Sequence, residues 1–133
     1  MMYAPNVFTL VPKYILYGYP IESSIGVLKL TIKSAKGLRN AERFGGTSDP
    51  YCKVILQSSD VKIAEKELSR TKFINNSLNP VWNETYYLLL NNLKDVIKFN
   101  IFDSNGKFGA DTLLGSTAIH LQSLSEKLNQ SNR

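Results

Sequence analysis

From Gly26 onward, hydrophobic and polar residues alternate in short runs, as they do in β-strands with one face in water. Leu28, Leu30 and Ile32 are separated by single polar residues, so their side chains point to the same face of a strand. Five further segments have the composition of strands: 51–57, 68–74, 81–90, 96–102 and 114–121. For segment 60–67 the sequence leaves two alternatives, a loop or a poor strand.

Residues with turn-forming chemistry separate these segments: Gly45–Gly46, Ser48–Pro50, Asn79–Pro80 and Asn105–Gly106. Strands divided in this way predict an all-β fold, an antiparallel β-sandwich. Near the end of the chain, Ser123 and Glu126 have the spacing of a capping box. Leu121, Leu124 and Leu128 share one helical face. We therefore predict a short C-terminal helix.

The first 25 residues differ from the rest. Residues 1–16 are apolar with an aromatic residue every few positions, and residues 17–24 contain glycine, proline and two serines. The second composition indicates a linker. We expect residues 1–25 to be the tail of a preceding module with its linker, and residues 26–133 to form the sandwich domain.

Composition narrows the class of protein. The chain has 133 residues, which suits about one domain, and its 43% hydrophobic and 20% charged residues exclude a disordered chain. No apolar run approaches the roughly 20 residues of a membrane-spanning helix. A single cysteine, Cys52, cannot form an internal disulfide and suits a reducing compartment. These features predict a soluble domain.

The net charge of +5 lies in the first part of the chain. Residues 1–72 contain 11 bases and 6 acids, whereas residues 73–133 contain five of each. Such a field fits an acidic partner: nucleic acid, a membrane surface or an acidic protein. Nucleic acid is disfavoured, because a nucleic-acid surface would interleave aromatic residues with lysine and arginine on one sheet face. Only Tyr51 and Lys53 fit this pattern.

Three motifs follow one another along the chain: GGTSDPY at residues 45–51, NPVWNE at 79–84, and FDSN at 102–105 followed by Asp111 and LLG at 113–115. Over about residues 26–121 they resemble the C2 domain, an eight-stranded β-sandwich with Greek-key connections that binds phospholipid membranes, often through calcium. The segment Met2–Asn6, a linker and Gly26–Leu28 resemble the junction in tricalbins and extended synaptotagmins where a lipid-transfer domain precedes the first C2 domain. This resemblance implies a piece of a larger tether, anchored in the endoplasmic reticulum, that acts on its cytoplasmic side at contacts with the plasma membrane.

One departure concerns the last strands. A C2 domain whose first strand starts at Gly26 needs two more strands after Leu121, but the chain ends at Arg133. Either those strands are lacking, or the segment Phe8–Leu16 fills part of the gap and covers an open sheet edge. The sequence leaves both alternatives open.

The resemblance also implies a calcium site made by five aspartate positions on two loops. The residues at these positions are Arg43, Asp49, Asp103, Asn105 and Asp111. Calcium takes six to eight oxygen ligands, whereas a guanidinium stays charged and competes with a dication for carboxylates. We therefore disfavour calcium and expect Arg43 to pair with Asp103 or Asp111. Glu42 is adjacent to Arg43, but a shift by one residue would re-aim its side chain. In the alternative interpretation the aspartates only shape turns.

Alternation along the predicted strands groups four residues. Tyr51 and Lys53 share one face, and Arg70 and Lys72 share a face opposite Thr71 and Phe73. C2 domains that recognise phosphoinositides carry a cationic cluster on these two strands, and the resemblance implies that Tyr51, Lys53, Arg70 and Lys72 bind lipid here. Ile55 departs from that pattern.

Neighbouring residues modify this prediction. Lys62 and Lys66 add positive charge, whereas Glu65 and Glu67 dilute it. On the loops, Phe44 follows Arg43 and Phe108 follows Lys107. Exposed aromatics beside bases suit the interface between headgroups and acyl chains, so Phe44 and Phe108 are predicted lipid contacts. If both were buried, they would instead be core at the end of the sandwich.

The sequence thus predicts a non-enzymatic domain that docks on anionic phospholipid, such as phosphatidylserine or phosphoinositides, without needing calcium. A Ser-His-Asp triad would have His120, the only histidine, as its one possible base, and the sequence has no nucleophile elbow to accompany it. The competing interpretation is a structural or protein-interaction module, a spacer or dimer contact, that binds neither lipid nor calcium. Any homo- or hetero-oligomer would form through the parent protein.

Overall fold

The computed structural model describes residues 7–11, 26–42, 45–105, 109–124 and 126. Its strands, in chain order, are β1 (Val7–Val11), β2 (Gly26–Ser34), β3 (Pro50–Gln57), β4 (Lys66–Arg70), β5 (Val81–Leu90), β6 (Val96–Asp103) and β7 (Thr112–His120). Residues 121–124 are helical. This element list confirms the predicted all-β class and the short C-terminal helix.

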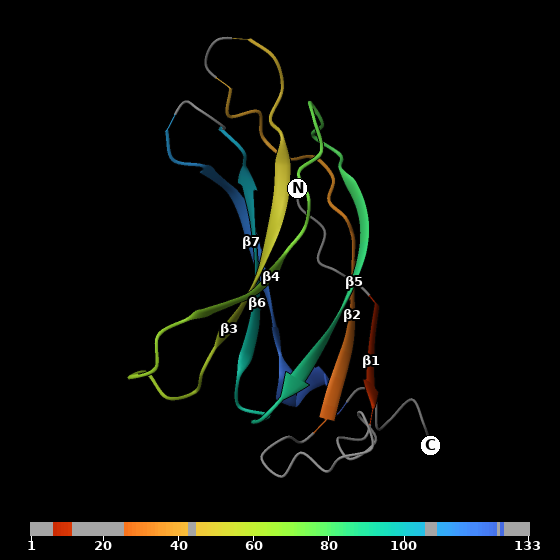
Figure 1. Ribbon diagram of the computed structural model, residues 1–133, viewed down its shortest axis with the longest axis vertical. Helices are drawn as coiled ribbons and strands as arrows, with labels where there is room; N and C mark the ends of the chain where they lie inside the picture. Colours follow the sequence, from red (N-terminus) through yellow and green to blue (C-terminus); the bar gives the residue numbers. More distant parts are fainter. Residues whose placement is uncertain (1–6, 12–25, 43–44, 106–108, 125, 127–133) are drawn as a thin grey trace.

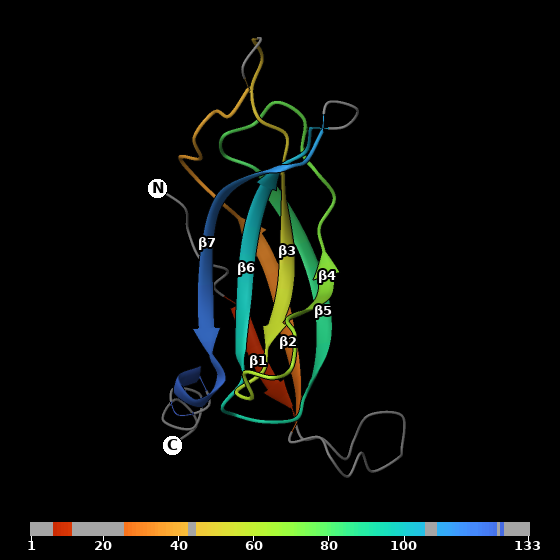
Figure 2. The same cartoon turned by 90° about the vertical axis from the view of Figure 1, so that its left-hand side faces the viewer.

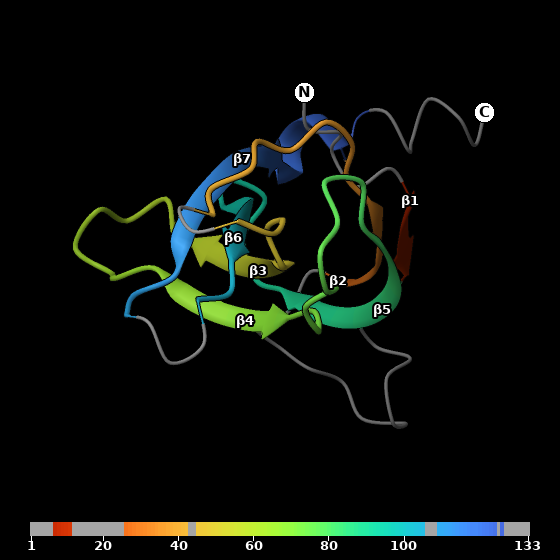
Figure 3. The same cartoon turned by 90° about the horizontal axis from the view of Figure 1, so that it is seen from above.

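The strands form two sheets that pack face to face (Figure 1). The smaller sheet has the order β1-β2-β5 and the larger one has the order β4-β3-β6-β7, and all neighbouring strands are antiparallel. The chain passes between the sheets after β2, after β4 and after β5. Figure 2 shows the larger sheet face on, and Figure 3 shows the two layers along the strands. The predicted antiparallel sandwich is therefore confirmed.

Alternation places the apolar side chains between the layers. Leu28, Leu30 and Ile32 of β2 are each no more than 1% exposed, and they share one core with Val54 of β3 and Phe99 of β6. On β2, Lys29 and Lys33 alternate with these residues and are exposed, and Thr31 is half-buried. Full burial of such a side chain is worth about 1.5–3 kcal/mol, so this pattern holds the register of β2 against the larger sheet.

Part of the N-terminal segment joins the sandwich. The backbone of Val7–Val11 pairs with residues 27–31 of β2, so β1 covers one edge of β2. Of the two alternatives for the missing strands, the structure therefore supports the one in which N-terminal residues fill part of the gap. The domain boundary at residue 26 stays a prediction.

β4 ends four residues earlier than predicted. The strand stops at Arg70, and Thr71 is buried directly after it. Thr71 Oγ1 accepts a hydrogen bond from the backbone N–H of Cys52 (2.9 Å) and donates one to the carbonyl of Lys72 (3.0 Å). The N–H of Thr71 still donates to the carbonyl of Cys52 at 2.9 Å, so the hydroxyl replaces only the reciprocal ladder bond. Strict alternation does not continue to Lys72 and Phe73.

The helical turn begins earlier than predicted. Its first residue is Leu121, whose N–H donates to the carbonyl of Asp95 at 3.3 Å. Ser123 therefore lies inside the turn and is not its N-cap, so the predicted capping box is wrong. Leu128 lies outside the described residues.

Candidate functional site

Three carboxylates gather at the end of the sandwich where β6 ends and β3 begins (Figure 1). Glu42 and Asp49 belong to the segment between β2 and β3, and Asp103 is the last residue of β6. One oxygen from each of the three lies within 4.8 Å of the others. Asp103 is completely buried, and its Oδ1 accepts a hydrogen bond from the N–H of Asp49 at 2.8 Å.

Among the described residues, no basic side chain forms an ion pair with this carboxylate cluster. In the described part of the chain, Asp103 Oδ2 is buried and has no hydrogen-bond partner. Asp103 raises the pKa of Glu42 above its ordinary value, first because its carboxylate accepts a hydrogen bond from the protonated form of Glu42 and then because of its charge. A buried carboxylate oxygen without a partner is costly, and carboxylate oxygens are the ligands that calcium and magnesium prefer. The residues of the cluster therefore fit a divalent cation.

The cluster contains Asp49 and Asp103 from the predicted metal ligands, but Asp111 has other partners. Asp111 Oδ2 accepts a hydrogen bond from the Tyr51 hydroxyl, and its Oδ1 accepts one from the N–H of Asn105 at 3.0 Å. The Tyr51 hydrogen bond lowers the pKa of Asp111. Asn105 Nδ2 donates to the carbonyl of Ala110. The second loop is thus tied to β3 and to itself.

Glu42 is the residue that sequence reasoning set aside. Its N–H donates to Asn40 Oδ1 at 3.1 Å, and Asn40 Nδ2 donates to the carbonyl of Gly46 at 2.9 Å. Gly46 has φ of 85°, which glycine adopts without strain. This folded segment brings Glu42 beside Asp49. The sequence offered one signal for Glu42 as a member of the cluster: it is an acidic residue directly beside the expected ligand position, residue 43. Arg43, Phe44 and Phe108 lie outside the described residues, so the pairing of Arg43 and the two aromatic contacts stay predictions.

The predicted lipid-binding bases lie on the larger sheet, and we call Tyr51, Lys53, Arg70 and Lys72 the basic surface. Lys53 of β3 and Arg70 of β4 are cross-strand partners. Glu67 accepts hydrogen bonds from Arg70 Nε (2.9 Å) and Nη2 (2.8 Å), and lies 3.8 Å from Lys53 Nζ. Since Glu67 offsets part of their charge, the basic surface is less positive than a count of its bases indicates.

Aromatic rings support these bases. The Tyr51 ring stacks on Phe102 with centroids 5.9 Å apart. Lys53 Nζ lies 4.6 Å from the centre of the Phe102 ring, and the Arg70 guanidinium lies 5.6 Å from that of Tyr51. Such cation–π contacts hold a base over a ring face. Burial, followed by the hydrogen bond to Asp111, raises the pKa of Tyr51 to about 12. Tyr51 is therefore a buried support and does not project from the surface.

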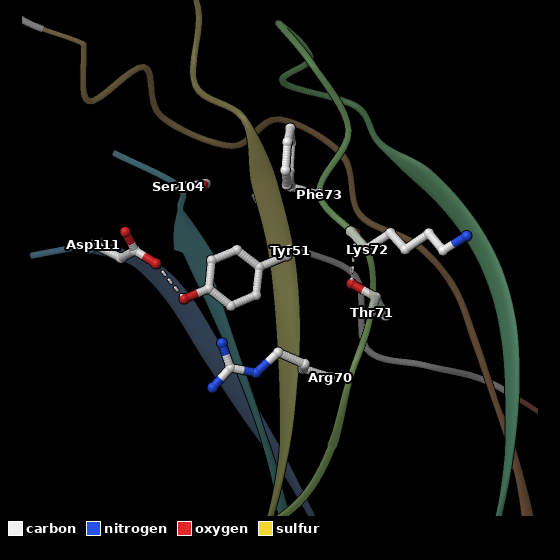
Figure 4. A pocket seen from close by; sticks show the side chains of 7 residues that line it. All are labelled: Tyr51, Arg70, Thr71, Lys72, Phe73, Ser104 and Asp111. Atoms are coloured by element: carbon white, nitrogen blue, oxygen red, sulfur yellow. Dashed lines mark hydrogen bonds between the residues drawn. The ribbon is translucent and has the colours of Figure 1, made fainter. Parts of the chain in front are cut away.

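A shallow pocket of about 170 Å³ lies beside this ring (Figure 4). Its lining comes from the start of β3, the end of β4 and the loop after β6: Tyr51, Arg70, Thr71, Lys72, Phe73, Ser104 and Asp111. Figure 4 shows the Lys72 side chain extending away from Tyr51 and Arg70. The backbone N–H of Lys72 donates to Glu84 Oε2 at 2.9 Å. Lys72 and Arg70 therefore border the pocket from different directions, and Phe73, which alternation placed on the opposite face, lies on the pocket with 52% of its surface exposed.

Two other reactive residue types have ordinary positions. Cys52 is buried in the core, and burial raises its pKa to about 12, so its thiol is protonated at neutral pH. His120 is exposed at the end of β7. Among the described residues, no helix is long and apolar enough to cross a membrane.

The family profile described as "C2 domain" matches residues 26–133. The chain belongs to the C2 domain family.

Similar proteins place this C2 domain more closely. It is 36% identical over 110 residues to Tricalbin-1 of Saccharomyces cerevisiae and 35% identical over 124 residues to Tricalbin-3 of the same yeast, which covers 82% and 93% of the chain. It spans only 9% and 8% of the length of these relatives. A C2 domain of plant extended synaptotagmin 1 has the same fold, with a TM-score of 0.61 and 27% identity over 74% of this chain and 71% of that chain. The predicted kinship with tricalbins and extended synaptotagmins is confirmed.

Proposed function

We propose that this C2 domain is a non-enzymatic module that docks on bilayers containing anionic phospholipids, with the basic surface against the headgroups and without a requirement for calcium. The observation that carries the proposal is the pocket of about 170 Å³ bordered by Arg70 and Lys72. Phosphatidylserine and phosphoinositides are the expected lipids, because both place anionic groups at the membrane surface.

The chemistry of the pocket supports an anionic ligand. In the described part of the molecule, the pair with Glu67 uses Nε and Nη2 of Arg70 and leaves the Nη1 donors for a phosphate. Arginine suits phosphate because its planar donors match two oxygens at once. Each base near an anionic leaflet is worth about 1 kcal/mol. The few bases of the basic surface therefore give weak docking, which becomes useful when a tether raises the effective concentration.

Kinship with tricalbins and extended synaptotagmins supports a setting for this docking. We infer that the domain belongs to a larger protein of the endoplasmic reticulum, acts on the cytoplasmic side and helps hold that membrane against the plasma membrane. Self-association or association with related chains would occur through that larger protein.

Vesicle co-sedimentation tests the proposal. Neutral, phosphatidylserine and phosphoinositide vesicles are compared in calcium and in chelator, with wild type and with the double variant Arg70→Gln/Lys72→Gln. At about 1 kcal/mol per base, the variant should bind anionic vesicles about thirtyfold more weakly. The matched control is Lys29→Gln/Lys33→Gln, which removes the same charge from exposed positions on β2 of the other sheet.

Each outcome has a distinct meaning. Equal losses in the two double variants would mean that net charge, not the pocket, governs binding. Binding in calcium alone would contradict the proposed calcium independence. Absence of binding to every vesicle would favour the spacer or protein-interaction module.

A second candidate function is binding of a divalent cation by Glu42, Asp49 and Asp103. The buried Asp103 Oδ2, which has no partner in the described part of the chain, favours it. Bound calcium would neutralise the cluster and hold the segment before β3 against the end of β6. Titration calorimetry with calcium should then show binding by wild type and weaker binding by Glu42→Gln. The matched control Glu65→Gln changes an acid that pairs with Lys98 far from the cluster. If wild type binds no calcium, this candidate fails.

A further inference from the structure

The loop between β3 and β4 carries two strongly exposed aliphatic residues, one of which is the most exposed aliphatic residue of the described chain. Val61 is 96% exposed and Ile63 is 59% exposed. Figures 1 and 2 show this loop, residues 58–65, projecting from the outer face of the larger sheet, the face on which Lys53 and Arg70 lie. Two strongly exposed aliphatic side chains at one projecting tip can leave water if the tip meets an apolar layer.

Hydrogen bonds hold the tip in a defined conformation. The N–H of Ser59 donates to Oδ1 of the buried Asp95 at 3.0 Å. Asp60 then forms a turn, because its Oδ1 accepts from the N–H of Lys62 and its carbonyl accepts from the N–H of Ile63, both at 3.0 Å. The turn therefore presents Val61 and Ile63 to solvent as part of an anchored structure.

The charges around the tip fit an anionic surface. Lys62 lies between the two aliphatic residues, and Lys66, the first residue of β4, is also exposed. The loop also carries two acids, of which Glu65 pairs with Lys98 at 2.7 Å and Asp60 accepts the N–H of Lys62 within the turn. Aliphatic side chains flanked by lysines suit the zone where acyl chains meet headgroups, because lysine stems lie along the apolar layer while the ammonium groups stay among phosphates.

We propose that Val61 and Ile63 insert into the same bilayer that the basic surface contacts, so that the β3–β4 hairpin lies along the membrane. This inference rests on the proposed docking function. β3 has eight residues and so spans about 26 Å, which separates the pocket at one end from the aliphatic tip at the other. Contacts at both ends set the orientation of the domain, which one pocket alone leaves free to rotate.

A fluorescent label at the tip reports insertion directly. Cys52 is 1% exposed, so an environment-sensitive thiol label attaches selectively to Val61→Cys in the folded protein. On phosphatidylserine vesicles, its emission should shift to the blue and be quenched by brominated acyl chains. The control is Tyr87→Cys, an exposed site on β5 of the other sheet, whose emission should not change.

A second variant measures what the tip contributes. Val61→Ser/Ile63→Ser should weaken binding to phosphatidylserine vesicles about tenfold, because two aliphatic side chains no longer leave water. The matched control, Val81→Ser/Leu89→Ser, removes two exposed aliphatic residues from the outer face of β5 and should bind like wild type.

The outcomes separate this inference from the function on which it rests. Vesicle binding with an unchanged label at position 61 overturns insertion and leaves the docking function intact. Equal binding of the tip variant and wild type also overturns it. If wild type binds no vesicle, both fail. If the tip variant binds vesicles like wild type but no longer binds a protein partner, the tip is a protein contact. That result would overturn insertion.

Discussion

Tyr51 connects two groups of residues that the sequence keeps far apart. Its ring stacks on Phe102 and lies under Arg70, and its hydroxyl donates to Asp111, 60 positions along the chain. It is therefore a structural support of the pocket, and its contact with a headgroup stays a prediction. Its hydroxyl bonds a carboxylate, so the hydrogen bond also affects how that carboxylate titrates.

Tyr51→Phe keeps the ring and removes this bond. In wild type the pKa of Asp111 is lowered, so the bond stabilises the folded state above the unfolded pKa of about 3.8 and is lost as pH falls through the folded value. The variant should lose about 1 kcal/mol of unfolding free energy at neutral pH, and the difference should shrink below about pH 4. Carboxyl NMR should show the pKa of Asp111 rising. Tyr87→Phe is the control. An unchanged Asp111 titration would contradict the role of the hydroxyl.

For Glu42, the dependence of folding stability on pH has the opposite sign. Its pKa is raised by Asp103, so wild type without divalent cations loses stability as pH rises from 4.5 through the raised value. We expect Glu42→Gln to melt at a higher temperature than wild type at neutral pH in chelator, and the two curves to converge in acid. Calorimetric scans at several pH values measure this. A lower melting temperature for the variant would mean that the charge of Glu42 is compensated.

At the scale of elements, the end of β4 determines which residues line the pocket. Alternation over segment 68–74 places Lys72 with Arg70 and sends Phe73 to the opposite face. Because Thr71 turns inward and satisfies the N–H of Cys52, the strand stops, and Lys72 and Phe73 border the pocket from other directions.

Thr71→Val tests this role of the hydroxyl. The variant leaves the buried N–H of Cys52 without an acceptor, which should cost about 2 kcal/mol of unfolding free energy. Chemical denaturation measures the loss. Thr71→Ser keeps the hydroxyl and should be less destabilised. If valine and serine have equal effects, the hydrogen bond does not determine where β4 ends.

At the scale of the whole molecule, the sandwich includes residues that the family profile does not match. The profile starts at residue 26, yet β1 pairs with β2 from Val7 to Val11. Its backbone hydrogen bonds satisfy an edge that would otherwise be open to pairing with other chains.

Removing residues 1–25 should therefore destabilise the sandwich. The ladder bonds of β1 are worth about 0.5–1.5 kcal/mol each, so the loss should be about 3 kcal/mol, accompanied by greater aggregation. The fragment 7–133 keeps β1 and is the matched comparison. Thermal unfolding and light scattering measure both. Equal stability of the fragment 26–133 and the full chain would support a domain boundary at residue 26.

Much of this architecture follows from alternation alone. Leu28, Leu30 and Ile32 predict β2 and its buried face, and strong β patterns at 81–90 and 96–102 predict β5 and β6 nearly to the residue. Prediction fails where a single side chain overrides a periodic pattern, as Thr71 does at the end of β4.

The candidate site was harder to predict. Folding of its loop brings Glu42 beside Asp49 and Asp103, which residue spacing does not encode. The sequence predicts that Glu67 dilutes the charge, but not that it contacts both Arg70 on its own strand and Lys53 on the neighbouring strand. The sequence also leaves the pairing of β1 open, because nothing within Val7–Val11 specifies β2 as its partner. These are tertiary effects, whereas sequence periodicity reports local structure.

The carboxylate cluster and the pocket share two short stretches of backbone. Asp49 of the cluster is two residues from Tyr51 of the pocket, and Asp103 of the cluster is bonded to Ser104 of the pocket. The N–H of Ser104 also donates to the carbonyl of Asp49 at 3.0 Å. A ligand that shifts either stretch thus changes both places, and thermodynamic linkage requires the effect to be reciprocal. By whatever factor a cation alters headgroup affinity, the headgroup must alter cation affinity equally, so a membrane would act as an effector of ion binding.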